Sequence, residues 1–399
     1  GFSYIINDRH SIGAYYQNSW NRHNTDGTIP SEIWQNGILL DLYNSDVHNQ
    51  STAVPRHYAN IYYNGIVGKL NIDFNADYIW YKSRELTFNN ELSEMGNDRE
   101  VNTSSINRNR MFAEKLVMTY PLWKGQIEIG EEYTNTRTTN LFSANIPETP
   151  NADNRVDENN IAVFAELGQQ FGRFMIGAGL RYEHVKFNYY EMGLLRDGQS
   201  KTYNNIFPSL NIATEVGKVR MGLNYTGKTI RPGYDQLDGA ISYINRLTYE
   251  TGNPYLKPTK LQTVEYMAQW RRFFAQLSFT YFKDGVYHIT EPYGPEGEAT
   301  IIRTANLDHR HYLQAFVGGN FQVGIWQPKV NIGMMKQWLS LPLNGEQVNM
   351  NTPIFMFQWQ NAVHLPFDIW LNIDAQLMTR GWDNNTRLTN TPWYVNAKI

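Results

Sequence analysis

The segment Arg231–Pro258, RPGYDQLDGAISYINRLTYETGNPYLKP, decides how the rest of the chain is interpreted. It is long, rich in aromatic residues and broken by Pro and Gly, which predicts a loop rather than a helix or a strand. Apolar and polar residues alternate in the segments on either side, Lys218–Thr229 and Thr259–Trp270. Because successive side chains of a strand point to opposite faces, this alternation predicts two strands joined by a long loop.

Corners that contain Pro bound this segment. Pro254 and Pro258 bias the residue before each of them towards extended or turn geometry, and Gly252 permits a positive φ before the bend. We therefore expect a structural rim formed by Arg231, Pro232, Gly252, Asn253, Pro254, Leu256, Lys257 and Pro258. The alternative hypothesis gives a ligand-contact role to four tyrosines of the segment, namely Tyr234, Tyr243, Tyr249 and Tyr255.

Composition narrows the class of protein. The chain has 399 residues, a net charge of −3, no Cys, and 26 Tyr, 19 Phe and 11 Trp. No run approaches the ~18 apolar residues of a spanning helix, which excludes a helical membrane protein. A β-barrel remains open at a mean hydropathy of −0.52, because alternate residues of its strands face a polar lumen. The lack of Cys excludes disulfides, thiolate catalysis and Cys metal sites.

The alternating pattern recurs along the whole chain. It is clearest in Lys69–Arg84, where Leu70, Ile72, Phe74, Ala76, Tyr78 and Trp80 share one face and Asn71, Asp73, Asn75 and Asp77 share the other. About seventeen such strands and no helix are predicted. The predicted strands are about eleven to sixteen residues long, which exceeds the usual globular length and suffices to cross a bilayer at a tilt.

Connections between the predicted strands alternate between tight turns of about two to five residues and loops of about seven to thirty, which is typical of transmembrane barrels. The predicted loops include His23–Ser51 (with a local hairpin at Ile33–Tyr43), Glu85–Ser105, Phe142–Asn159, Glu191–Thr202, EPYGPEGE (291–298), LPLNGEQ (341–347) and WDNNTRLTN (382–390). Aromatic residues beside the tight turns resemble an interfacial girdle: Tyr120, Trp123, Trp270 and Trp326. The predicted fold is therefore an all-β, antiparallel, up-and-down transmembrane barrel.

Other candidate chemistry is sparse. Asp308, His309 and His311 place two imidazoles on one strand face, where a metal site competes with solvated rim histidines. Glu128, Glu131 and Glu132 suggest acid/base work, but carboxylates are expected on a polar lumen face. Further lumen candidates are Asp73, Asp77, Arg181, Glu183, Arg220 and Asp374. Because no catalytic motif is found and basic residues are dispersed, we predict no catalytic residue, no metal, no cofactor and no nucleic-acid partner.

Several segments carry a family resemblance. FPSLNIA (Phe207–Ala213), LNYTGKTIRPGYDQLDG (Leu223–Gly239) and TYETGNPYLKPTKLQTVEY (Thr248–Tyr266) resemble the barrel signature of TonB-dependent outer-membrane receptors. The similarity is greatest to the Bacteroidetes outer-membrane β-barrel group of that superfamily. Arg56–Tyr78 and Thr391–Ile399 resemble the same group.

The resemblance implies a barrel of twenty-two strands around an N-terminal plug. Neither the plug nor a TonB-contacting segment is recognisable, and both termini have strand-like patterns. We therefore expect residues 1–399 to be one outer-membrane barrel domain, truncated at both ends, whose plug and closing strands lie outside it.

The implied function is uptake of a scarce nutrient across the cell outer membrane of a Gram-negative bacterium, with energy supplied through TonB. The implied partners are outer-membrane lipid, the TonB complex, and a small-molecule, peptide or glycan substrate. Two alternatives remain open: a passive pore, adhesin or scaffold barrel, and a soluble β-rich binding or enzymatic domain. The resemblance favours the receptor over both.

Overall fold

One curved antiparallel sheet forms most of the protein. The computed structural model describes residues 1–53, 55–295, 297–343 and 346–399. A ladder of seventeen strands runs through the sheet in chain order. These strands are β1 (Phe2–Asn7), β2 (His10–Ser19), β5 (Arg56–Val67), β6 (Leu70–Ser93), β7 (Arg99–Leu122), β8 (Gly125–Ala144), β9 (Ala152–Phe171), β10 (Phe174–Glu191), β12 (Lys201–Val216), β13 (Val219–Ile230), β16 (Thr259–Trp270), β17 (Phe273–Tyr293), β18 (Ala299–Asn320), β19 (Trp326–Trp338), β22 (Ile354–Leu365), β23 (Ile369–Met378) and β26 (Trp393–Lys398).

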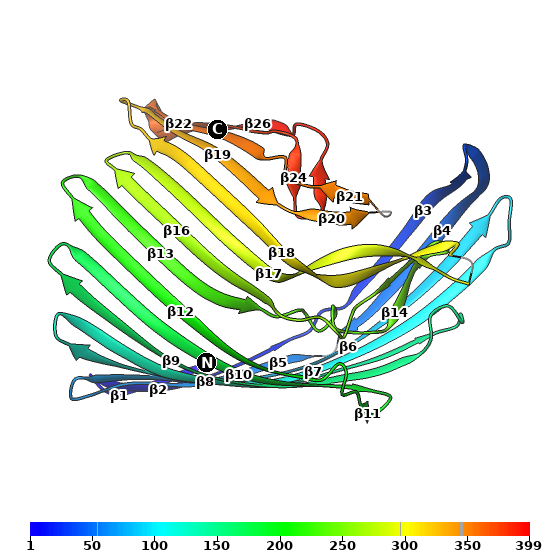
Figure 1. Ribbon diagram of the computed structural model, residues 1–399, viewed down its shortest axis with the longest axis horizontal. Helices are drawn as coiled ribbons and strands as arrows, with labels where there is room; N and C mark the ends of the chain where they lie inside the picture. The colour runs from blue at the N-terminus through cyan, green and yellow to red at the C-terminus, as the bar shows by residue number, and fades with distance from the viewer. Residues whose placement is uncertain (54, 296, 344–345) are drawn as a thin grey trace.

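The sheet bends into a trough whose two edge strands, β1 and β26, lie at the bottom and the top of Figure 1. Within the described residues no backbone pairing joins β1 to β26, so the sheet is not closed. The predicted all-β, antiparallel, up-and-down architecture is confirmed. The part of the chain that the structure describes holds no helix long and apolar enough to span a membrane.

Tight turns connect the strands at one end of the trough, as the sequence predicts. Six of them have two residues between paired strands. In five of these six, one residue has a positive φ, and this residue is Gly68, Trp123, Gly172, Gly217 or Arg271. Glycine adopts this conformation without steric cost. At the end of β22, the turn Pro366–Asp368 is a short 3-10 helix, η1.

Strands extend beyond their predicted ends at the opposite end of the trough. The predicted loops Glu85–Ser105 and Phe142–Asn159 are wrong, because β6 continues to Ser93 and β7 already begins at Arg99. The loop between β8 and β9 shrinks in the same way to the residues between Ala144 and Ala152. Backbone pairing does not need an apolar face. A strand that is polar on both faces lacks the apolar/polar alternation, so this pattern does not predict it.

The predicted excursion His23–Ser51 is a long hairpin, β3 (His23–Gln35) and β4 (Ile38–Ala53). Asn36 and Gly37 join the two strands with φ values of 52° and 79°, which is the requirement of a type I′ turn. The hairpin predicted at Ile33–Tyr43 is thus confirmed and is longer than expected. β4 pairs with the second half of β6, beyond the part that pairs with β5.

Short strands also occupy other predicted loops. Residues 191–202 include β11 (Leu194–Leu195), and residues 382–390 include β25 (Thr386–Leu388) and most of β24 (Gly381–Asp383). β20 (Ser340–Leu343) pairs with β21 (Glu346–Asn349) across LPLNGEQ, whose Asn344 and Gly345 lie outside the described residues. Glu296 of the predicted EPYGPEGE loop also lies outside them.

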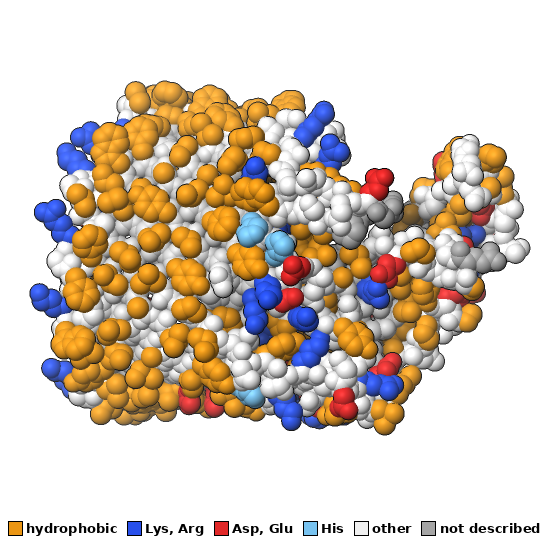
Figure 2. Space-filling view, viewed as in Figure 1, with side chains coloured by type: hydrophobic (Ala, Val, Ile, Leu, Met, Phe, Trp, Pro, Cys, Tyr) orange, Lys and Arg blue, Asp and Glu red, His pale blue; other side chains and the backbone are white. Residues whose placement is uncertain are grey.

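The two faces of the sheet differ in chemistry. Large apolar side chains stand exposed on the convex face, among them Ile129, Leu180, Ile206, Val264, Leu277, Val317 and Ile332. Figure 2 shows hydrophobic side chains over the half of the visible surface that carries the tight turns, with Lys and Arg at its margin and most other charges in the opposite half. The predicted girdle residues Tyr120, Trp123, Trp270 and Trp326 are exposed at this margin. The alternation predicted along Leu70–Trp80 therefore corresponds to a convex apolar face and a concave polar one.

The segment Arg231–Pro258, here called the crossing segment, begins directly after β13 and ends directly before β16, as predicted. The prediction that it contains no strand is wrong, because it holds a hairpin of β14 (Ile241–Asn245) and β15 (Thr248–Thr251). β15 also pairs, in parallel, with β18. Figure 1 places β14 inside the trough rather than on its rim. Frequent Pro and Gly conceal these two short strands in the sequence.

Candidate functional site

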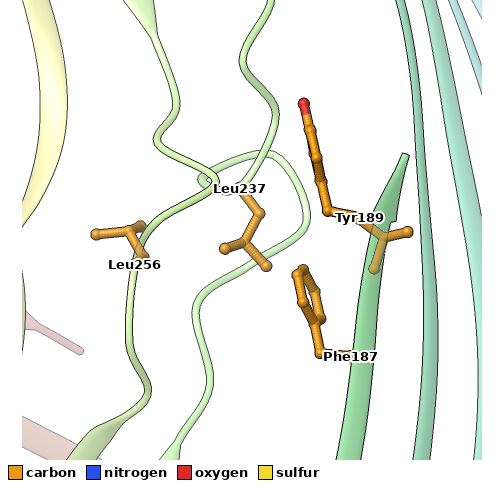
Figure 3. Close-up of a cluster of buried hydrophobic side chains, with 5 residues drawn as sticks. Phe187, Tyr189, Leu237 and Leu256 are labelled. Carbon is orange, nitrogen blue, oxygen red and sulfur yellow. The ribbon is translucent and has the colours of Figure 1, made fainter. Parts of the chain in front are cut away.

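Apolar packing holds the crossing segment against the concave wall. Leu237 and Leu256 of the segment are 5% and 3% exposed, and they pack with Val156 of β9 and with Phe187 and Tyr189 of β10. Figure 3 shows Leu237 between Leu256 on one side and the rings of Phe187 and Tyr189 on the other. The contact removes these side chains from water, which favours the folded-in position of the segment.

A buried arginine fixes the far end of the crossing segment. The Nε of Arg246 lies 2.9 Å from Glu91 Oε2 on β6, and its NH1 lies 3.2 Å from Asp41 Oδ2 on β4. The Glu91 side chain is fully buried, and it also accepts a hydrogen bond of 2.7 Å from the Tyr243 hydroxyl. The Arg246 guanidinium stacks on the ring of Tyr43 at 4.4 Å. A buried carboxylate needs such partners. The crossing segment supplies them to Glu91 on the wall.

Asp41 has a second set of partners on the wall. Its carboxylate accepts hydrogen bonds from the Ser93 hydroxyl at 2.7 Å and from the backbone N–H of Met95 at 3.2 Å. The Ser93 hydrogen bond is the main reason that the pKa of Asp41 is lowered. The carboxylate therefore stays charged opposite Arg246 at neutral pH.

Charged residues on the concave face form a chain that leads to the start of the crossing segment. Arg231 NH2 lies 3.2 Å from Glu183 Oε2, and Glu183 accepts from Arg181 Nε at 2.8 Å. Arg181 NH2 reaches Glu132 at 2.6 Å, and Lys115 binds the same carboxylate at 2.9 Å. The predicted lumen residues Arg181 and Glu183 are thus paired with each other.

The other predicted charged residues are dispersed. Arg220 pairs with Glu215 at the exposed turn between β12 and β13, and Asp77 accepts from Tyr58 and Asn60. Asp73 accepts from Asn75. Glu128, Glu131 and Asp374 have no ion pair within the described residues. These groups do not converge on one point, as a catalytic site would require.

The candidate metal ligands lie on β18. The rings of His309 and His311 are 5.8 Å apart, which confirms that they share a strand face. His309 Nδ1 lies 3.0 Å from Asp308, and His311 packs against Phe279 and Tyr281. Among the described residues no group of three or more His, Cys, Asp or Glu side chains is arranged to hold a metal ion.

A chamber of about 820 Å³ lies between the crossing segment and the concave wall. Such a volume falls within the range of roughly 300–1,000 Å³ that is usual for small-ligand sites. Hydroxyl and amide side chains dominate its lining: Ser83, Thr87, Thr103, Ser105, Asn107, Thr138, Asn140, Asn154, Gln236, Ser242, Thr251 and Thr304. The aromatic lining residues are Tyr81, Phe142, Tyr189, Tyr234 and Tyr243. The ionisable lining side chains besides tyrosine are Glu85, Asp235, Asp238, Glu250 and His288.

The four tyrosines predicted as ligand contacts separate into two groups. Tyr234 and Tyr243 line the chamber. Tyr249 is 2% exposed and packs against Tyr293 with ring centroids 4.8 Å apart, and Tyr255 is 57% exposed on another side of the segment. The geometry is therefore suited to a ligand-contact role for the first two only.

Burial changes the protonation chemistry of the crossing segment. It raises the pKa of Tyr234 to about 12 and also raises the pKa of the Asp238 carboxyl. Asp238 accepts hydrogen bonds from Asn154 at 2.6 Å and from the backbone N–H of Ala240 at 3.0 Å. Burial therefore favours the uncharged form of both side chains.

Most of the residues predicted to form a structural rim fix the return corner of the crossing segment. The backbone N–H of Asn253 donates to Gln236 O at 2.6 Å, and its side chain donates to Thr304 O at 3.0 Å. Lys257 exchanges two hydrogen bonds with Asn306. Pro232, Leu256 and Pro258 line a small apolar pocket, and Pro254 stands in the turn that follows Asn253.

Gly252 is required for a reason other than the predicted positive φ. Its φ is not among the positive values in the chain. A Cβ at this position would lie 2.3 Å from Asp238 O and 2.6 Å from Gln236 O, which is closer than atoms approach. The expectation of φ > 0 is therefore wrong, and close backbone approach explains the glycine.

Most residues that line the chamber were missed by sequence reasoning, although a signal for them exists. On β6 the lining residues Tyr81, Ser83, Glu85 and Thr87 alternate with residues that do not line it, and β7 repeats this with Thr103, Ser105 and Asn107. This is the period of a strand. A search for period two among short polar side chains, rather than apolar ones, would have found them.

Known proteins share this architecture. A mutant of the ferric enterobactin receptor PfeA from Pseudomonas aeruginosa, in complex with enterobactin, aligns over 97% of this chain and 72% of its own, at 12% identity and a TM-score of 0.50. The ferric-catecholate import receptor Fiu from Escherichia coli K12, in its closed form, aligns over 99% of this chain and 71% of its own, at 11% identity and a TM-score of 0.49. At such identities these likenesses concern the fold alone. No curated protein sequence matches the chain.

A family model agrees with the fold and covers most of the chain. The model of the "Outer membrane protein beta-barrel family" matches residues 67–399. The matched region includes the crossing segment and most of the strands that line the chamber. This protein of the cell outer membrane therefore belongs to the outer membrane protein β-barrel family.

Proposed function

We propose that this chain is the barrel of an outer-membrane receptor that takes up a scarce nutrient, with energy supplied through TonB. The observation that carries the proposal is the chamber of about 820 Å³ between the concave wall and the crossing segment. A receptor must hold a small ligand before it is transported, and a concave cavity with aromatic and polar lining serves that purpose. The proposal gives the protein no catalytic role.

The contacts of the crossing segment favour a receptor over a passive pore. A passive pore works best with an open interior, whereas this segment lies across the trough and is fixed by Arg246 to Glu91 and Asp41. Passage of a ligand along the concave face would require displacement of the segment. Such displacement needs energy, which agrees with an energised receptor.

TonB coupling and a Bacteroidetes origin belong to the same proposal and rest on the resemblance of Phe207–Ala213, Leu223–Gly239 and Thr248–Tyr266 to that group of receptors. The proposal also requires a plug and a TonB-contacting segment, which the resemblance places N-terminal to the barrel in a longer protein.

Nutrient depletion tests the proposed function. A strain that produces the whole protein and a strain that lacks it are grown in the same medium, and the compounds removed from each medium are identified by mass spectrometry. We expect at least one compound to be removed only by the producing strain. Inactivation of TonB should abolish that removal, whereas removal that continues without TonB would identify a passive pore.

A further inference from the structure

The chamber carries negative charge that basic residues do not neutralise. Glu85, Asp235 and Glu250 line it and are exposed, and within the described part of the chain they form no ion pair. No Lys or Arg is found among the described residues that line it. A ligand with net negative charge would meet like charge here, which costs binding free energy.

Two arginines near the chamber are already paired. Arg246 is held between Glu91 and Asp41, and Arg99 binds Glu148 at 2.8 Å. Their charge is therefore not available to an anion in the chamber. An anionic metal chelate is a poor fit for this lining, although solved structures with a similar fold are iron-chelate receptors.

The neutral side chains of the chamber distinguish an uncharged ligand from a cation. Asn107, Asn140 and Thr138 can each donate and accept hydrogen bonds, and such groups outnumber the carboxylates in the lining. An ammonium or guanidinium group offers donors only, so the donors of the chamber would lose their water without replacement. A ligand with many hydroxyl groups satisfies both kinds of partner.

Aromatic side chains line the chamber from both sides. Tyr81 and Tyr189 belong to the wall, and Tyr234 and Tyr243 belong to the crossing segment. The face of an aromatic ring packs well against an apolar C–H surface. The C–H faces of a sugar ring supply such a surface, while its edge presents the hydroxyl groups.

We infer that the chamber binds an uncharged oligosaccharide, with Tyr234 and Tyr81 packing on sugar rings and the hydroxyl and amide side chains of β6, β7 and β8 holding the hydroxyl groups. This inference rests on the proposed receptor function and specifies its ligand. Glu85, Asp235 and Glu250 act as hydrogen-bond acceptors for sugar hydroxyls and exclude anionic compounds.

Glycan binding by the whole protein tests the inference. The protein is purified in lauryldimethylamine oxide, because a detergent with a sugar headgroup would compete, and is applied to a printed array of uncharged oligosaccharides with sulfated and sialylated counterparts. We expect binding to one or more uncharged glycans and not to their acidic counterparts. Calorimetry with the best glycan should give an affinity that changes less than about twofold between low and high salt, because an uncharged ligand is not screened.

Variants then locate the site. Tyr234→Ala and Tyr81→Ala should each weaken binding of that glycan about tenfold or more, which corresponds to about 1.4 kcal/mol. Tyr234→Phe keeps the ring and should retain most of the affinity. Tyr255→Ala changes a tyrosine of the same segment that does not line the chamber, and it should bind as the unchanged protein does. A melting curve for each variant checks that it folds.

Three results would overturn the inference: no binding to any uncharged glycan, binding confined to acidic glycans or to ferric enterobactin, or glycan binding that both Tyr234→Ala and Tyr81→Ala leave unchanged. An affinity for the uncharged glycan that falls steeply with salt would contradict recognition through neutral contacts. TonB-dependent depletion of a nutrient other than a sugar would refute an oligosaccharide as the ligand but would leave the proposed receptor function standing. Absence of both glycan binding and TonB-dependent nutrient depletion would refute the proposed function as well.

Discussion

Arg246 shows how much one residue contributes to the position of the crossing segment. Its side chain is 14% exposed and faces a Glu91 side chain with no exposure. Arg246→Ala leaves that carboxylate buried without its partner, which typically costs about 3–5 kcal/mol. We expect amide hydrogen exchange in β14 and β15 to accelerate strongly, as mass spectrometry of the corresponding peptides would detect.

Arg220→Ala is the matched control for this prediction. Arg220 and Glu215 form an ion pair whose side chains are 72% and 57% exposed, and such surface pairs contribute little. Exchange in the crossing segment should not change in this variant. If Arg246→Ala also left exchange unchanged, Arg246 would not hold the segment.

The close backbone approach at Gly252 can be tested by substitution. In Gly252→Ala the new methyl group would meet the backbone oxygens of Asp235, Gln236 and Asp238, which cannot move independently. Overpacking of this kind costs about 1–3 kcal/mol, so we expect a lower melting temperature and faster exchange around the corner. Gly222→Ala is the control, because a Cβ there meets no atom within 4 Å. Equal melting temperatures for the two variants would contradict the close-approach explanation.

The local sequence pattern predicts where the strands and turns of this fold lie better than it predicts which distant residues contact one another. The ends of β13 and β16 and the tight turns follow from alternation and from Gly and Pro positions. By contrast, Arg246 contacts Glu91 and Asp41 across 155 and 205 residues of sequence. Nothing in the local sequence indicates which distant carboxylate a buried arginine will meet. The chamber was missed for the same reason, since its lining comes from strands far apart in the chain.

Removal of the β14–β15 hairpin tests whether it obstructs the interior of the trough. Replacing Ile241–Thr251 with a short Gly-Ser linker removes the part of the crossing segment that reaches Glu91 and Asp41. We expect the whole protein to show a larger single-channel conductance in planar lipid bilayers, because the interior is less obstructed. Replacing Leu194–Leu195 of β11, which are 63% and 48% exposed, with Gly-Ser serves as the control. An unchanged conductance after the first replacement would show that the hairpin does not obstruct the interior.

The whole molecule is organised by the contrast between its convex apolar face and its concave polar face. This contrast was predictable, because it depends only on the period-two alternation of side chains. Whether the sheet closes could not be predicted in the same way. In the described residues β1 and β26 have no pairing with each other, so the sheet is open. Closure depends on the number and tilt of all strands, which local pattern does not determine.

In the outer membrane the convex face must contact lipid. Leu180 of β10 alternates with the concave side chains of Arg181 and Glu183 and is 56% exposed. A charged residue at the bilayer midplane of a barrel costs about 2–4 kcal/mol, so Leu180→Arg should reduce the amount of folded protein in outer-membrane fractions. Leu194 is 63% exposed on β11, at the end with the long loops. Leu194→Arg places the same charge in water and should leave the folded amount unchanged. Equal loss in both variants would mean that Leu180 does not face lipid.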